Sequence, residues 1–112
     1  MTDRSAQAPL FVDALALNQW LLERFATAAH PLEQRVLRLA LDLLECLTLA
    51  LKGRNRDLRI EQADELLIRL RVLLRLAADS GRLHADQYAY VLGRIDSIGR
   101  QLGAWRRSLG PL

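Results

Sequence analysis

Residues that support disulfide frameworks, thiolate metal clusters or β-sheets are almost absent from this sequence. The 112 residues include one cysteine, Cys46, which excludes a disulfide framework and suits a reducing compartment. Aromatic residues make up 5% of the chain, and β-branched residues are scarce. Because aromatic and β-branched residues favour strands, their shortage favours helices, and we find no strand pattern, internal repeat or low-complexity tract.

The chain also lacks a membrane or export signal. Its most apolar window, residues 36–51, contains Arg38, Asp42 and Glu45 and is too short to cross a bilayer. The first residues do not combine a basic stretch, an apolar run and a cleavage site. We therefore expect a cytoplasmic protein with no membrane partner.

Leucine dominates what is present, with 26 residues distributed over four helical segments. Pro31 suits the first position of a helix, Asp57 suits an N-cap, and Gly81 suits a helix end. The pattern predicts a frayed N-terminus over residues 1–8 and one domain over residues 9–112, with helices at about 9–28, 31–52, 58–80 and 85–109. Since short connections make neighbouring helices antiparallel, we expect an all-α, up-down-up-down four-helix bundle.

The apolar surface of these segments exceeds what one bundle core needs. The second segment is apolar around most of its circumference, outside a polar strip that includes Arg38 and Glu45. The third segment adds Ile68, Val72 and Leu76 on the side away from its core-facing leucines. A helix needs only one apolar stripe to face a core, and surplus apolar surface on a small protein marks an interface. We therefore expect an oligomer.

The excess of positive charge is confined to the second half of the chain. Up to Leu51 the chain carries four basic and six acidic groups, and beyond it twelve basic and seven acidic groups, so the halves have net charges of −2 and +5. Arg71 and Arg75 are four residues apart on one helix face, and Arg100 and Arg107 are one heptad apart on another. Asp79 lies four residues beyond Arg75, and we expect the two to form a surface ion pair. A basic half indicates a polyanionic partner such as nucleic acid, and a solvated arginine-rich surface is the alternative.

Residues for catalysis or cofactor binding are nearly absent. The two histidines, His30 and His84, stand at predicted helix starts without Cys, Asp or Glu at the spacing of a zinc site, and N-cap roles explain them. The sequence has no Glu-x-x-His pair and no Gly-rich phosphate loop. We expect no enzyme activity, metal or cofactor. One alternative stays open, because Arg24 and His30 match the loose Arg-x(4–6)-His pattern of HEPN-type ribonucleases.

The fourth segment has an apolar stripe that we expect to face the core, formed by Tyr88, Val91, Ile95, Ile98, Leu102 and Trp105. Three glycines, Gly93, Gly99 and Gly103, also lie inside this segment. Each costs about 1 kcal/mol relative to alanine in a helix interior. Because Gly99 and Gly103 are four residues apart, we expect them to let another backbone approach closely, which would offset that cost.

The most specific pattern is the sequence IGRQLGAW at residues 98–105. Upstream are LRVLLR at residues 70–75, a Gln-Tyr pair at residues 87–88, and HPLEQR at residues 30–35. Together these resemble the four-helix-bundle family that contains Avd, the accessory variability determinant of diversity-generating retroelements. That family has an I-G-R-x-L-G-G/S-W signature, an L-R-x-x-L-R helix and a second helix that begins with proline. The similarity covers about residues 10–107.

This resemblance implies a homopentameric barrel of four-helix bundles without catalysis of its own. It implies binding to RNA or DNA and to the reverse transcriptase of the element, in support of mutagenic retrohoming, in which a template repeat is copied with errors to diversify a target gene. Carried over by position, the nucleic-acid-binding residues are Arg71, Arg75, Arg100, Arg106 and Arg107. The same family includes proteins encoded in intervening sequences of 23S ribosomal RNA genes; such a protein, or an interaction scaffold, is the alternative.

Overall fold

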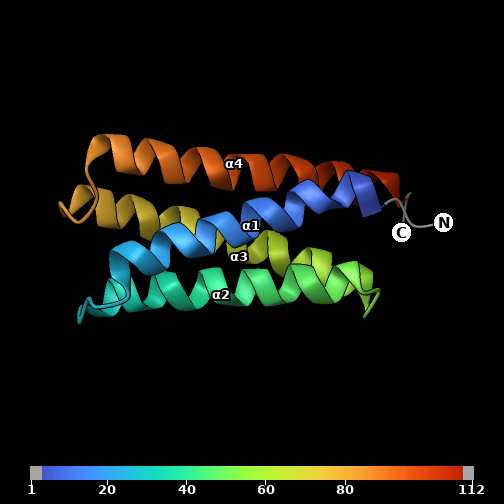
Figure 1. Cartoon of the computed structure of the whole chain (residues 1–112), viewed down its shortest axis with the longest axis horizontal. Coiled ribbons are helices and arrows are strands. Elements are labelled where there is room, and N and C mark those ends of the chain that lie inside the picture. Colours follow the sequence, from blue (N-terminus) through green and yellow to red (C-terminus); the bar gives the residue numbers. More distant parts are fainter. Residues whose placement is uncertain (1–3, 110–112) are drawn as a thin grey trace.

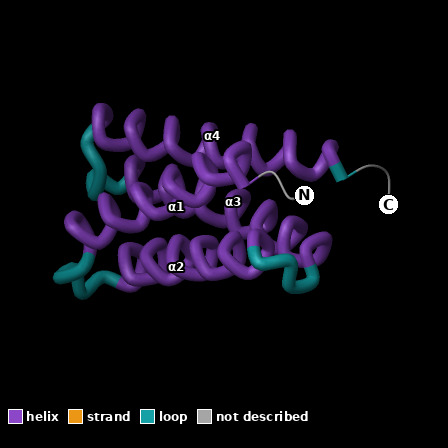
Figure 2. The backbone as a smooth tube through the Cα atoms, turned by 45° about the vertical axis from the view of Figure 1, so that its right-hand side comes forward, coloured by secondary structure: helices purple, strands orange, loops and turns teal. Residues whose placement is uncertain are grey.

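The computed structural model describes the backbone of residues 4–109 and the side chains of residues 9–109. It contains four helices and, in this described part, no strand: α1 (Arg4–Phe25), α2 (Pro31–Leu51), α3 (Arg56–Asp79) and α4 (Ala85–Ser108). The all-α prediction is therefore confirmed. The four helices lie side by side in a rod of 45 × 23 × 21 Å (Figures 1 and 2).

Each helix packs against two neighbours. α1 lies next to α2 and α4, and α3 lies next to the same two helices, whereas the Cα atoms of the diagonal pairs of the described bundle stay more than 8 Å apart. In Figure 1 the α1–α2 and α3–α4 connections lie at one end of the bundle, and the α2–α3 connection lies at the other. None of the helices in the described part of the chain has both the length and the hydropathy that a bilayer crossing requires.

The first helix differs from the sequence prediction at both ends. It begins at Arg4 instead of Pro9, so residues 4–8 are helical where a frayed N-terminus was expected, and residues 1–3 lie outside the described part. Pro9 removes one backbone donor, but so near the helix start water can satisfy the freed carbonyl, and the helix continues through it. The helix ends at Phe25, whose carbonyl accepts from Ala28 N at 3.0 Å.

The start of α3 also differs from the prediction. The N-cap residue is Asn55 and not Asp57, and its φ of 49° lies in the left-handed region that asparagine tolerates. Gly53, with a φ of 78°, supplies the other left-handed turn of the α2–α3 connection. The chain thereby reverses quickly enough for α3 to begin at Arg56. Asp57 falls in the first turn, where its carboxylate interacts favourably with the helix dipole.

Both histidines are N-cap residues, as predicted. His30 precedes α2, and its Nδ1 accepts a hydrogen bond from Leu32 N at 3.1 Å. His84 precedes α4, and its backbone N–H donates to Gln87 Oε1 at 2.9 Å. These bonds satisfy polar groups that a helix start or its junction otherwise leaves free.

The core is one cluster of aliphatic side chains from all four helices. The predicted core stripe of α4 is confirmed: Val91, Ile95, Ile98, Leu102 and Trp105 are buried, and Tyr88 packs partly buried against them. The wide apolar arc of α2 is mostly buried inside the chain, because α2 packs on both α1 and α3. The expected surplus on α2 is thus reduced to two exposed leucines, Leu41 and Leu49.

A buried asparagine ties α1 to α2. Asn18 is only 3% exposed, and its Nδ2 donates to the carbonyl oxygens of Ala14 and Ala40, each at 2.9 Å. The bond to Ala40 crosses between the two helices. Because the buried amide loses this interhelical hydrogen bond if the helices slide, Asn18 fixes the register of α1 on α2.

Replacing Asn18 with alanine should lower the free energy of unfolding by about 1–2 kcal/mol, since the interhelical hydrogen bond is lost and a small cavity forms. Urea unfolding measures the change. Gln19→Ala, at the exposed neighbouring position, is the control and should change stability by less than about 0.5 kcal/mol. Equal stability of the two variants would contradict the role of Asn18.

Candidate nucleic-acid interface

The five arginines predicted to bind nucleic acid all lie on α3 and α4. Arg71 and Arg100 line a surface hollow of about 340 Å³ between these helices. The hollow is also lined by Asp64, Leu67, Ile68, Asp96 and Gly99. The structure therefore brings Arg71 and Arg100 to one place and leaves Arg75, Arg106 and Arg107 outside it.

Arg71 is held between the two helices. Its Nη1 forms an ion pair with Asp96 of α4, and both side chains are a little under half exposed. A Cβ at position 99 would lie 3.3 Å from Arg71 Nη2, so Gly99 provides the space in which the guanidinium lies. A Cβ at position 103 would lie 3.4 Å from Arg107 Nη1, a side-chain atom of the same helix. The expected close approach of a second backbone at these glycines is therefore wrong within the chain.

Two further arginines of the set also have acidic partners. Arg106 Nη2 lies 2.7 Å from Glu61 Oε1 of α3. Arg75 Nε lies 3.7 Å from Asp79 Oδ2, which confirms the predicted pairing four residues along α3. Both members of that pair are well exposed, so it contributes well under about 1 kcal/mol and leaves Arg75 accessible.

Arg100 and Arg107 are the exposed arginines of the set that form no ion pair with the described side chains. They lie one heptad apart on the outer face of α4. The α3–α4 face thus carries mixed charge, with Asp64 and Asp96 beside the arginines of the hollow. Its uncompensated positive charge is concentrated on Arg100 and Arg107.

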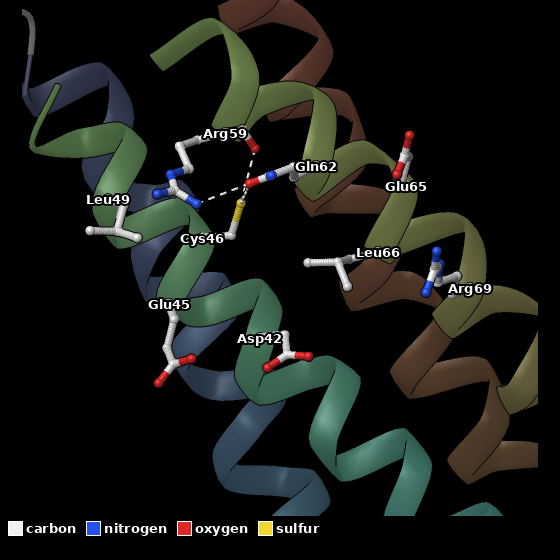
Figure 3. A pocket seen from close by; sticks show the side chains of 9 residues that line it. All are labelled: Asp42, Glu45, Cys46, Leu49, Arg59, Gln62, Glu65, Leu66 and Arg69. Carbon is white, nitrogen blue, oxygen red and sulfur yellow. Dashed lines mark hydrogen bonds between the residues drawn. The ribbon is translucent and has the colours of Figure 1, made fainter. Parts of the chain in front are cut away.

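A second hollow, of about 320 Å³, lies between α2 and α3 (Figure 3). The Cys46 thiol at its floor donates to the Arg59 carbonyl oxygen at 3.0 Å, and Arg59 Nη1 donates to Gln62 Oε1 at 3.1 Å. Burial raises the pKa of the Cys46 thiol, which makes it a poor nucleophile. Acidic and basic side chains line the rim together, namely Asp42, Glu45, Glu65, Arg59 and Arg69. This hollow therefore favours neither an anion nor a cation.

A polar and aromatic cluster lies between α1 and α4 and was not predicted from the sequence. Asp13 of α1 is its centre: Oδ1 accepts from Arg94 Nη1 at 2.7 Å, and Oδ2 accepts from Ser97 Oγ at 2.9 Å and Gln101 Nε2 at 2.6 Å. Arg94 Nε also lies 3.3 Å from the Tyr90 hydroxyl. The contact with Tyr90, reinforced by Asp13, raises the pKa of the Arg94 guanidinium, so it stays charged.

The same cluster continues into a row of stacked side chains. The Trp20 and Tyr90 ring centroids are 5.3 Å apart, the Arg24 Cζ lies 4.6 Å from the Trp20 ring centroid, and the Arg94 Cζ lies 5.5 Å from that of Tyr90. The signal that indicates this row is an aromatic residue four positions before an arginine, present once in α1 and once in α4. Side chains with that spacing are neighbours on a helix surface.

The two residues of the HEPN-like pattern take part in other contacts. Arg24 lies over the Trp20 ring, and His30 Nδ1 is engaged by Leu32 N at the start of α2. These contacts do not form an acid–base pair and favour the N-cap explanation of His30. Among the described residues, no three His, Cys, Asp or Glu side chains are grouped so as to hold a metal ion.

The glycines of α4 allow a matched test of this geometry. Gly93→Ala should raise the free energy of unfolding by about 1 kcal/mol, because a Cβ there meets nothing within 4 Å. Gly99→Ala should gain clearly less, because its Cβ pushes the Arg71 guanidinium away from Asp96. Urea unfolding of both variants measures the difference. Equal gains would contradict the packing of Arg71 against Gly99.

Comparison with known proteins identifies a family. The family model described as bAvd-like matches residues 21–109, which include the last residues of α1 and the other three helices. A search of curated proteins and a search of solved structures each find no match. The family match covers most of the chain and agrees with the resemblance carried by residues 98–105. The chain belongs to the bAvd-like family.

Proposed function

We propose that this protein is a non-enzymatic accessory of a diversity-generating retroelement, which binds nucleic acid and the element's reverse transcriptase to support mutagenic retrohoming in the cytoplasm. Membership of the bAvd-like family over residues 21–109 supports this role. The observation that carries the nucleic-acid part is the pair Arg100 and Arg107, exposed on α4 without an acidic partner in the described structure.

Phosphate binding suits these two side chains. A guanidinium has a planar set of donors that matches phosphate oxygens, and an exposed arginine without an ion pair gives up no internal contact when it binds. Arg71 and Arg75 extend the same surface along α3, but Arg71 must share its guanidinium with Asp96. We therefore expect Arg100 and Arg107 to contribute most to phosphate binding, Arg75 less, and Arg71 and Arg106 least.

We further propose that the chain, as an up-down-up-down bundle, assembles into a homopentamer through α3. Ile68, Val72 and Leu76 recur every four residues on its outer face and are 56%, 62% and 51% exposed. An apolar stripe of this kind on a small protein is typical of an interface. Repetition of the arginines around a closed ring would turn a net charge of +3 per chain into an extended basic surface.

An interaction scaffold, or a protein of the 23S ribosomal intervening-sequence kind, is the second candidate. It is favoured by the acidic partners of Arg71 and Arg106, namely Asp96, Glu61 and Asp64. These partners weaken the positive potential of the α3–α4 face. The two candidates differ in whether the protein binds nucleic acid at all.

Removing Arg100 and Arg107 should weaken binding to a labelled single-stranded RNA and reduce its salt dependence. For two lost phosphate contacts, the slope of log K against log salt should become shallower by about 1.4. Fluorescence anisotropy across a salt series measures this for Arg100→Ala/Arg107→Ala. The control is Arg35→Ala/Arg38→Ala, which removes two exposed arginines from α2 and should retain the wild-type slope.

A slope unchanged in Arg100→Ala/Arg107→Ala would show that the site is wrongly assigned. Parallel measurement of Arg71→Ala/Arg75→Ala, with an expected smaller loss, tests the ranking of the arginines. Absence of binding by the wild-type protein at low salt would refute the nucleic-acid role and favour the scaffold.

In the proposed assembly, the subunits associate through Ile68, Val72 and Leu76 of α3. Ile68→Ser/Val72→Ser should convert the assembly to monomers while the helical circular dichroism remains, because both side chains are exposed in the single chain. Light scattering gives the molar mass. Val12→Ser, at a 58% exposed position of α1, is the matched control and should leave the mass unchanged. A monomeric wild-type protein would overturn the assembly.

A further inference from the structure

Four side chains form a stacked row on the face shared by α1 and α4. Arg24 and Trp20 come from α1, and Tyr90 and Arg94 come from α4. The two rings meet across the helix boundary with 5.3 Å between centroids and 36° between planes, and a guanidinium covers each ring. We name these four residues the aromatic–arginine ladder.

The ladder is held in place by the core and by Asp13. Trp20 packs partly buried against the core, which fixes its ring. Arg94 is fixed by Asp13, whose second carboxylate oxygen accepts from Ser97 and Gln101. Because the rings are ordered before any ligand arrives, a ligand that stacks on them loses little affinity to ordering of the protein.

The outer part of the ladder remains available to a ligand. Tyr90 is 42% exposed. Arg24 is exposed and forms no ion pair with the described side chains, so its N–H edge and its outer face are open. The Tyr90 hydroxyl accepts from Arg94 Nε, which leaves its own proton free to donate.

We propose that the ladder binds a single-stranded nucleic acid, with one base stacked on the outer plane of the Arg24 guanidinium and a second base against the exposed part of the Tyr90 ring that Trp20 and Arg94 leave uncovered. This rests on the proposed nucleic-acid role and specifies its ligand. Bases of a single strand present their faces to aromatic rings and guanidinium planes, whereas those of a duplex are already stacked on each other. The free Arg24 edge contacts phosphate, and the Tyr90 hydroxyl donates to a base or phosphate oxygen.

A strand on the ladder continues naturally toward the arginines of α4. Arg100 lies ten residues beyond Tyr90, or about 15 Å along the helix axis. Between them, Gly93 is exposed, and a side chain at this position would meet nothing within 4 Å. No side chain projects from α4 at Gly93, so a nucleic-acid strand can lie close to the helix backbone between the stacking residues and Arg100.

Substitutions at Tyr90 test the ladder without disturbing the core. Tyr90→Leu keeps an apolar side chain but removes the aromatic face, and should weaken single-strand binding about tenfold. Tyr90→Phe keeps the face and loses only the hydroxyl, and should bind within about threefold of wild type. Anisotropy with a labelled twelve-nucleotide uridine strand measures both, and a duplex of the same length measures selectivity.

Tryptophan fluorescence reports on binding at the ladder, because Trp20 lies between Arg24 and Tyr90. Trp105→Phe leaves Trp20 as the single tryptophan, and an unlabelled uridine strand should then quench its emission, while the duplex should not. If this variant does not fold, the comparison of Tyr90→Leu with Tyr90→Phe in the wild-type background still decides the matter.

The outcomes separate the ladder from the proposed function. If the wild type binds the strand but Tyr90→Leu binds equally well, the ladder is not the site, although nucleic-acid binding stands. If Tyr90→Leu weakens duplex and single-strand binding alike, the single-strand assignment is overturned. If the wild type binds neither form, the proposed function itself has failed, and the ladder proposal fails with it.

Discussion

Burial of one apolar surface from each of four helices in a single shared core is the constraint on which the other features of this protein depend. In a square arrangement each helix touches two neighbours and leaves one side to solvent. A helix such as α2 can therefore bury a wide arc, whereas Ile68, Val72 and Leu76 of α3 fall on the open side. The apolar stripe on α3 is thus left over after the core is complete, which is why we assign it to assembly.

The same constraint leaves each arginine of residues 9–109 exposed or half-exposed, and helix packing determines which of them are neutralised. Arg94 meets Asp13 across the α1–α4 boundary, Arg71 meets Asp96 across the α3–α4 boundary, and Arg82 meets Glu33 of α2 at 2.7 Å. Arginines on the open side of a helix have no such partner. Arg100 is one of these, so the phosphate binding that we propose there breaks no internal ion pair.

The features that depend on a single helix could be predicted from the sequence. The core stripe of α4, the N-cap histidines and the Arg75–Asp79 pair follow from local spacing, and the structure has all of them. The N-cap of α3 was missed because it depends on left-handed residues in the connection. The partners of Arg71, the space at Gly99 and the Trp20–Tyr90 contact were missed because each depends on how two helices are rotated against each other. Spacing along one helix does not contain that information.

The central claim is that several copies of this chain act together on one nucleic-acid strand through exposed arginines. Sedimentation of the protein with a labelled single-stranded RNA tests it most directly, because it gives the mass of the bound species. We expect a complex with several protein copies at about 50 mM salt, which releases the RNA but keeps its protein mass at about 200 mM salt. A bound monomer, or a complex that is insensitive to salt, would contradict it.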